Sequence, residues 1–194
     1  MINIIIFALL YNAIFQILSL EFDIKIAQNF TSGIHLFICL ALNIIFFITD
    51  LLWIYKLAAT ITIGHYLFDI FYLLNYKKMN LMTGALIYHH LATIFYVQYD
   101  PYLYLNYLVL IFAEISNIPA LFIYHYLKTD PSNTRLKFWQ YIQKLVYIII
   151  RIPLFTGLSY YIWINTHDIL ALSICSPVFL MGIIWSFKLL QQKN

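Results

Sequence analysis

The sequence is a series of apolar runs, each long enough to cross a lipid bilayer, separated by short polar breaks. A helix that crosses a bilayer needs about 20 mostly apolar residues. Of the 194 residues, 63% are hydrophobic and only 10% are charged, whereas roughly 25% are charged in an average soluble domain. A water-exposed globule of this length cannot bury so much apolar surface. The sequence therefore predicts an all-α polytopic membrane protein and excludes a soluble catalytic domain and a nucleic-acid-binding module.

The positions of the breaks predict about seven membrane spans. These are expected at 1–20, 33–55, 58–76, 81–99, 103–127, 138–164 and 168–190. Lys77–Lys78, Asp100–Pro101 and the turn-rich stretch 129–133 mark three of the breaks. The join near Lys56 is the least marked, because spans two and three also read as one long helix and a fragment. The expected division is an N-terminal membrane anchor and loop over 1–32 and a multi-helix membrane domain over 33–194.

Lysine and arginine gather on one side of this seven-span arrangement, which predicts its orientation. Only Lys56 falls in a loop on the other side. The rich side carries Lys25, Lys77, Lys78, Lys128, Arg135, Lys137, Lys188 and Lys193. By the positive-inside rule the rich side is cytosolic, so the N-terminus is expected to be lumenal or outside and the C-terminus cytosolic. The glycosylation sequon at Asn29–Thr31 then faces the cytosol and is expected to stay unmodified.

Six ionisable residues inside the predicted spans stand out as costly. Such a group costs about 2.5–3.5 kcal/mol near the bilayer centre, so it usually faces a partner or a cavity. Five lie near mid-depth of spans three to six and one nearer the cytosolic side, so a helical ring around one polar interior is the simplest arrangement. The six are His65, Asp69, His89, His90, Glu114 and Arg151.

Histidine and aspartate spacing indicates candidate acid and base groups. His65 and Asp69 are four residues apart and share a helix face, so the carboxylate is expected to orient the imidazole, either for proton transfer or as a pair that joins helices. His89 and His90 are adjacent and point about 100° apart. They are therefore candidates for catalysis but do not form a chelating pair, and the sequence predicts no metal site.

The segment around Glu114 and the segment around Arg151 each combine a charge with a proline. Pro119 frees a backbone acceptor and is expected to kink the helix near Glu114, Ser116 and Asn117. This kink predicts either a pocket or a packing bend that the serine and asparagine satisfy. Arg151 is expected to pair with Glu114 or to bind a phosphate or carboxylate head group. His65, Ser116, Asn117 and Arg151 are thus candidate lipid-binding residues.

Other polar residues carry less weight. Cys39 and Cys175 lie inside apolar runs and support neither a disulfide framework nor a cysteine metal site. His35 and Asp50 in span two, and His125 near the end of span five, are expected near the membrane interfaces, solvated or snorkelling.

Five segments stand out, in this order along the chain: Gly64–Asp69, His89–Thr93, Glu114–Pro119, Arg151–Pro153 and Trp185–Lys188. Their order and spacing together resemble the TLC family, the membrane domain shared by ceramide synthases, translocation-associated membrane proteins and small lipid-regulating proteins. The first segment resembles a stretch of that family that ends in aspartate, the second resembles its H-H-x-x-T signature, and the third is similar to the E-x-S segment of its small members. The last two resemble its later helices. The chain lacks the H-D-x-x-D pattern of ceramide synthases, so it is more similar to the small members.

This resemblance implies a helical ring around a lipid-sized cavity in the endoplasmic reticulum or a related membrane. The implied function is to bind, sense or regulate sphingolipid, ceramide or acyl-chain lipids, with membrane lipids as partners and no cofactor. The alternative is a lipid acyltransferase that uses acyl-CoA, with catalytic candidates His89, His90, Asp69 and Glu114. A transporter or proton relay is a third hypothesis, which the absence of inverted repeats disfavours. Whether the chain is an enzyme, and whether it forms a homo-oligomer, stays open at this point.

Overall fold

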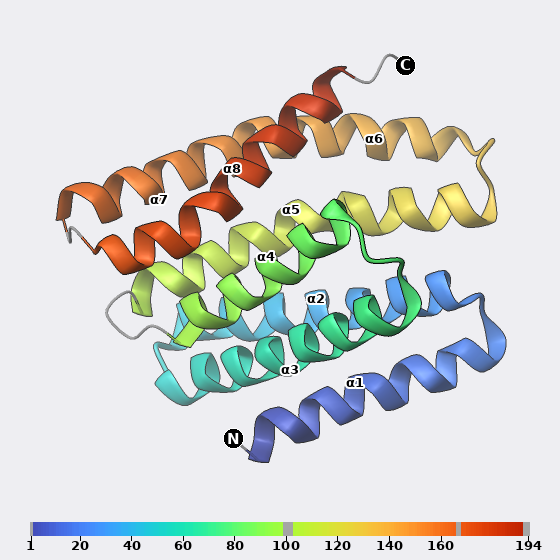
Figure 1. The fold of residues 1–194 in the computed structure, drawn as a ribbon, viewed down its shortest axis with the longest axis horizontal. Coiled ribbons are helices and arrows are strands. Elements are labelled where there is room, and N and C mark those ends of the chain that lie inside the picture. The colour runs from blue at the N-terminus through green and yellow to red at the C-terminus, as the bar shows by residue number, and fades with distance from the viewer. Residues whose placement is uncertain (1, 99–102, 166–167, 192–194) are drawn as a thin grey trace. The chain divides into compact units, whose positions relative to one another are not determined.

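The computed structural model describes the backbone of residues 2–98, 103–165 and 168–191. Every regular element in these ranges is a helix, and none is a strand (Figure 1). The elements are α1 (Ile2–Glu21), α2 (Ile24–Thr49), α3 (Leu52–Tyr76), α4 (Leu81–Gln98), α5 (Leu103–Thr129), α6 (Thr134–Val146), the π-helical turn η2 (Tyr147–Arg151), α7 (Ile152–Asn165) and α8 (Ile169–Gln191). The predicted break at Asp100–Pro101 lies outside the described residues.

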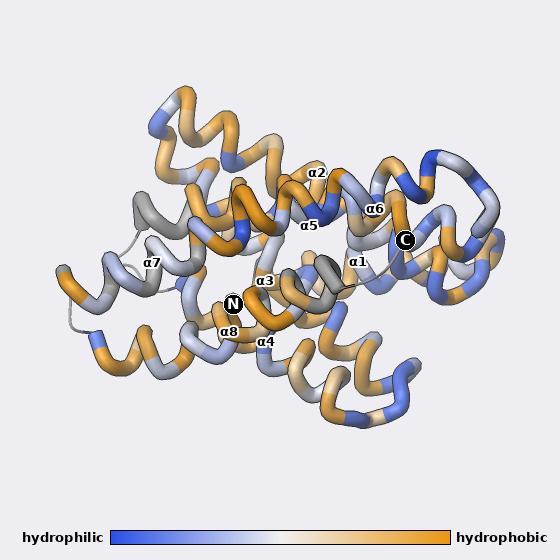
Figure 2. Tube along the Cα trace, turned by 90° about the horizontal axis from the view of Figure 1, so that it is seen from above, coloured by the Kyte–Doolittle hydropathy of each residue, from blue (hydrophilic) through white to orange (hydrophobic). Residues whose placement is uncertain are grey.

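Within the part of the chain that the structure describes, four helices are long and apolar enough to cross a membrane: α1, α2, α3 and the Leu108–Thr129 part of α5. Figure 2 shows hydrophobic residues along much of the helical backbone and hydrophilic ones at several of the turns. Large apolar side chains on these helices are exposed, for example Leu20 at 82% and Ile48 at 75%. By length and composition the chain is therefore consistent with a membrane protein, because such side chains are costly in water and favourable in lipid.

The chain divides into two compact units, Met1–Glu114 and Ile115–Asn194. In the first unit α3 packs against α1, α2 and α4. The two helices α1 and α3 lie close together at Gly64, because a Cβ added there would lie 2.6 Å from the Cβ of Phe7. Two apolar clusters hold the unit together. One contains Tyr11, Phe15, Ala27, Ile61, Phe68 and Tyr72, and the other contains Phe46, Ile54, Tyr55, Ile63, Val97 and Leu110.

The break between spans two and three is real, but its predicted position near Lys56 is wrong. The helix ends at Asp50, which adopts the left-handed conformation with φ of 54° and donates its backbone N–H to the Phe46 carbonyl. Aspartate tolerates this conformation better than most residues. Lys56 consequently lies within α3.

The start of the second helix also differs from the prediction. Instead of a loop as far as residue 32, α2 begins at Ile24, directly after a tight turn. The Asp23 carboxylate caps this helix by accepting from the backbone N–H of Lys25, 2.9 Å away. The cap satisfies a donor that would otherwise be unpaired. The predicted boundary after residue 32 therefore falls inside α2.

The only glycosylation sequon of the chain lies within α2 rather than in a loop. Asn29 is 9% exposed, Thr31 is fully buried, and the Thr31 hydroxyl donates to the Ala27 carbonyl. A glycosyltransferase needs an accessible, extended acceptor, so we expect no glycan at Asn29 on either side of a membrane. The measurement is the intact mass of the protein from a glycosylating host, before and after glycosidase. A glycosidase-sensitive shift that Asn29→Gln removes would contradict this placement.

In the second unit α8 packs against α7, η2 and α6. The turn before α6 lies where the sequence predicted it: the Asp130 carboxylate accepts from the Ser132 hydroxyl and the Asn133 amide, and these bonds lower its pKa below the usual range. Between α6 and α7 the backbone passes through η2, where the Ile152 N–H donates to the Tyr147 carbonyl five residues back. This wide turn directly precedes Pro153, which has no N–H to continue the α-helical pattern.

Candidate functional site

Five ionisable side chains come together inside the first unit, among its apolar helices. They originate from α2, α3, α4 and α5, and four of the five residues are less than 9% exposed. We call this group the polar centre: His35, His65, Asp69, His90 and Glu114. Tyr66 connects its members, since its ring stacks on that of His90 at 4.8 Å and lies 5.8 Å from that of His65. Four of the six residues expected at one place, His65, Asp69, His90 and Glu114, thus come together, whereas His35 was not expected there.

The spacing had predicted that Asp69 pairs with His65, but in the structure Asp69 pairs with His90. The distance from His90 Nε2 to Asp69 Oδ2 is 3.1 Å. The other carboxylate oxygen of Asp69 accepts from Gln28 Nε2 at 3.0 Å. Both oxygens are therefore engaged by side chains of α2 and α4. The i,i+4 rule places His65 and Asp69 on one face of α3, but the partner of a carboxylate depends on the neighbouring helices.

His65 instead stacks on His35. The two rings lie 4.0 Å apart between centroids and are nearly parallel, at 6°. The Tyr11 ring meets the His65 ring edge-on at 5.0 Å. His65 is 3% exposed, and neither of its ring nitrogens has a hydrogen-bond partner among the described residues. An imidazole buried in this way retains two unused polar atoms, which is costly unless something else binds them.

The structure distinguishes the two adjacent histidines. His90 is 8% exposed and faces Asp69, whereas His89 is only partly buried. The Nδ1 atom of His90 has no hydrogen-bond partner among the described residues. A carboxylate at Nε2 fixes the tautomer that leaves Nδ1 able to accept a proton. Of the two candidates, His90 therefore has the geometry of a general base.

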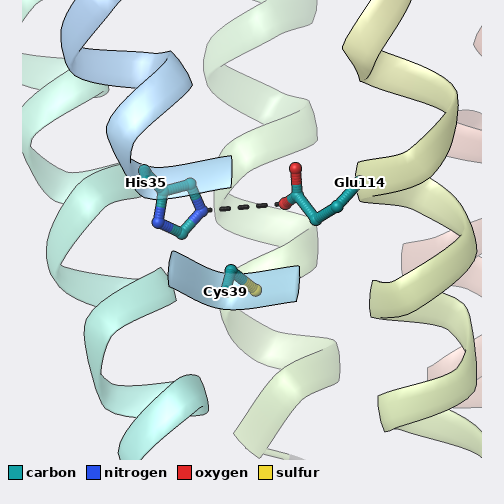
Figure 3. A group of neighbouring side chains, drawn as sticks. All are labelled: His35, Cys39 and Glu114. Atoms are coloured by element: carbon teal, nitrogen blue, oxygen red, sulfur yellow. Dashed lines mark ion pairs between the residues drawn. The ribbon is translucent and has the colours of Figure 1, made fainter. Parts of the chain in front are cut away.

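Glu114 lies near a histidine that the sequence analysis had placed at the membrane interface. His35 is in fact 2% exposed, in the interior of α2, because α2 begins at Ile24 and its midpoint shifts toward the N-terminus. The distance from His35 Nε2 to Glu114 Oε1 is 3.7 Å. Cys39, one turn after His35, points to the same place (Figure 3). Their i,i+4 spacing was the signal that could have identified this group.

Arg151 belongs to the second unit and is 8% exposed. Its Nε donates to the Ser116 hydroxyl at 2.7 Å, a terminal nitrogen donates to Asn117 Oδ1, and its guanidinium lies 4.4 Å from the centre of the Tyr147 ring. Three predicted head-group residues are thus brought together. The predicted ion pair between Arg151 and Glu114 links residues of different units and stays a prediction.

Two chemical capacities follow from these arrangements. The His90 and Asp69 pair resembles the base and orienting carboxylate used in acyl transfer. The group of His35, Cys39 and Glu114 offers nitrogen, sulfur and oxygen donors to a cation. Comparisons of the chain with protein-family models, with curated proteins and with solved structures find no match.

Proposed function

We propose that the chain is a multi-pass membrane protein that binds an acyl lipid, with the polar centre holding the lipid's polar head. The observation that carries this proposal is His65, which is buried among apolar helices with two unpartnered ring nitrogens. The hydroxyl or amide of a sphingolipid or ceramide-like head supplies the donor and acceptor that such an imidazole lacks. The acyl chains pack against apolar side chains, which needs no further polar partners.

We also propose that the chain has about seven membrane spans, which include the four apolar helices. These spans form a ring around a lipid cavity. The motifs His89–Thr93 and Glu114–Pro119 support membership of the TLC family. The distribution of lysine and arginine supports a lumenal N-terminus and a cytosolic C-terminus. The membrane we propose is that of the endoplasmic reticulum, and the role is to sense or regulate sphingolipid or acyl-chain levels.

Mass spectrometry of co-purifying lipids tests the proposal. Protein extracted in mild detergent is expected to retain a defined acyl lipid at near one copy per chain. His65→Leu removes the hydrogen-bonding ring, so retention is expected to fall about tenfold, the equivalent of one hydrogen bond worth about 1.4 kcal/mol. His65→Gln keeps a donor and an acceptor and is expected to retain most of the lipid. Equal retention by wild type and by the folded leucine variant would refute the proposal.

A second function, lipid acyl transfer, is favoured by the 3.1 Å contact between His90 and Asp69. In this reaction Nδ1 of His90 accepts a proton from the amine of a sphingoid base. The amine nitrogen of the sphingoid base attacks the thioester carbonyl of acyl-CoA, an amide bond forms and the carbon–sulfur bond breaks. The proton then passes from His90 to the departing CoA thiolate, which leaves as the thiol.

Purified protein in lipid nanodiscs, supplied with acyl-CoA and a sphingoid base, tests this second function. If the protein is an acyltransferase, His90→Gln is expected to lower the rate of amide formation by about 10²–10⁴-fold, the usual contribution of a general base. His89→Gln is the matched control and is expected to keep most of the rate, because His89 is only partly buried. An unchanged rate in the His90 variant would exclude His90 as the base.

A further inference from the structure

The geometry points to a zinc-binding site formed by His35, Cys39 and Glu114. His35 and Cys39 lie one turn apart on α2, and Glu114 comes from the first-unit part of α5. One donor atom from each residue lies within 4.8 Å of the other two. All three residues are buried (Figure 3). The site shares His35 and Glu114 with the polar centre, but it does not use the ring nitrogens of His65, which carry the lipid-binding proposal.

The distance between His35 and Glu114 suits a small cation. Zinc bonds of about 2.0–2.3 Å to nitrogen, oxygen and sulfur place tetrahedral donors roughly 3.3–3.7 Å apart. His35 Nε2 and Glu114 Oε1 already lie 3.7 Å apart, beyond a direct hydrogen bond. His35 Nε2 has no hydrogen-bond partner among the described residues, although it is fully buried. An ion between the two atoms explains why both side chains point there without touching.

Neighbouring side chains orient the donors as metal sites require. Tyr11 Oη lies 3.3 Å from His35 Nδ1, a contact that leaves Nε2 as the ligand atom. The sulfur of Cys39 lies 3.3 Å from Thr62 Oγ1 and accepts from Asn43 Nδ2 at 3.3 Å. Both contacts stabilise a thiolate at the moment it loses its proton to metal binding. The histidine and cysteine ligands are thus each supported by neighbouring side chains.

Charge balance selects a divalent cation. A thiolate from Cys39 and a carboxylate from Glu114 carry two negative charges, and a neutral His35 adds none. A divalent ion makes the group neutral, which lowers the cost of placing it among apolar helices. Magnesium and calcium prefer oxygen ligands alone, whereas zinc accepts nitrogen, sulfur and oxygen. Three protein ligands leave the fourth zinc position open.

Metal analysis of the purified full-length protein tests this site. Protein equilibrated with zinc sulfate and passed through a desalting column is expected to carry one zinc per chain. Cys39→Ser and Glu114→Gln nearly preserve side-chain shape and are expected to weaken binding by about 100-fold or more, since supporting residues alone contribute about 10–100-fold. Tyr11→Phe is expected to weaken it about tenfold. Cys175→Ser is the matched cysteine control and is expected to bind as wild type does.

Cobalt substitution gives a second measurement, which does not require any variant to fold. Wild-type protein titrated with cobalt chloride is expected to show a thiolate-to-cobalt charge-transfer band in the near ultraviolet, together with the visible bands of tetrahedral cobalt. Zinc added afterwards is expected to abolish both. Wild-type protein that shows no thiolate band, or a Cys39→Ser variant that keeps full zinc stoichiometry, would overturn the assignment.

Discussion

Gly64→Ala is expected to lower the free energy of unfolding by about 1–3 kcal/mol, the usual cost of overpacking a well-filled interface. The added Cβ would lie 2.6 Å from the Phe7 Cβ, 3.1 Å from the Ala8 nitrogen and 3.2 Å from the Ile4 carbonyl oxygen. Two of these are backbone atoms, so the clash is relieved only if α1 moves away from α3. Small residues allow such close helix contact in membranes, where van der Waals packing drives association.

Gly84→Ala is the matched control and is expected to raise the free energy of unfolding instead of lowering it. A Cβ at Gly84 meets no atom within 4 Å. Alanine in a helix is favoured over glycine by about 0.5–1 kcal/mol. This variant is therefore expected to unfold at a slightly higher temperature than wild type. Thermal unfolding of both variants in the same detergent is the measurement. Equal stability of the two would show that α1 and α3 do not approach at Gly64 as closely as the structure has them.

Asp69→Leu is expected to destabilise the first unit by about 3 kcal/mol, at the low end of the range for removing one partner of a buried pair, because the Asp69 side chain keeps 13% exposure. The substitution leaves His90 Nε2 and Gln28 Nε2 without their carboxylate. Gln28 Nε2 still donates to the Ser32 hydroxyl, but His90 loses its partner, and an unpartnered buried donor costs more than the net value of the bond it had made. If the protein binds a lipid as proposed, the same variant is expected to release it, because the rings around the polar centre lose their fixed positions.

A double-mutant cycle separates this interaction from general damage. If the contact is direct, Asp69→Leu combined with His90→Leu should destabilise the protein by less than the sum of the two single variants, with a coupling of about 0.5–3 kcal/mol. Asp69→Leu combined with Gly84→Ala is the control pair and is expected to be additive. Additivity in the Asp69 and His90 pair would mean that these side chains do not interact in solution.

Sequence reasoning predicted the helices well and their pairings poorly. Apolar runs locate helices because the hydropathy pattern depends only on residues that are close in sequence. The predicted break at 129–133, for example, was confirmed. The start of α2 was missed because a tight turn capped by Asp23 needs only two residues, which a hydropathy pattern cannot show. Because of this error, the sequence predicted His35 at the membrane interface, whereas it lies in the interior of α2.

The site was predicted in its residues more than in its contacts. Placing an ionisable side chain inside a membrane costs free energy, so such a residue usually has a partner or a function. This argument identified His65, Asp69, His90 and Glu114 from the sequence. The partner of Asp69 was not predictable, because it comes from α4 and depends on how the helices pack. Cys39 was missed for another reason: a thiol is apolar enough to read as packing until His35 and Glu114 are seen beside it.

Photo-crosslinking with a lipid analogue tests the central claim most directly. A sphingoid or fatty-acyl probe carrying a photoreactive group and an affinity handle is added to membranes, irradiated and mapped by peptide mass spectrometry. The account predicts labelled peptides from the segments that carry His35, His65 and His90, with labelling suppressed by excess unlabelled lipid. Labelling confined to outward apolar residues such as Leu20, Ile48 and Leu81, and insensitive to the competitor, would contradict it.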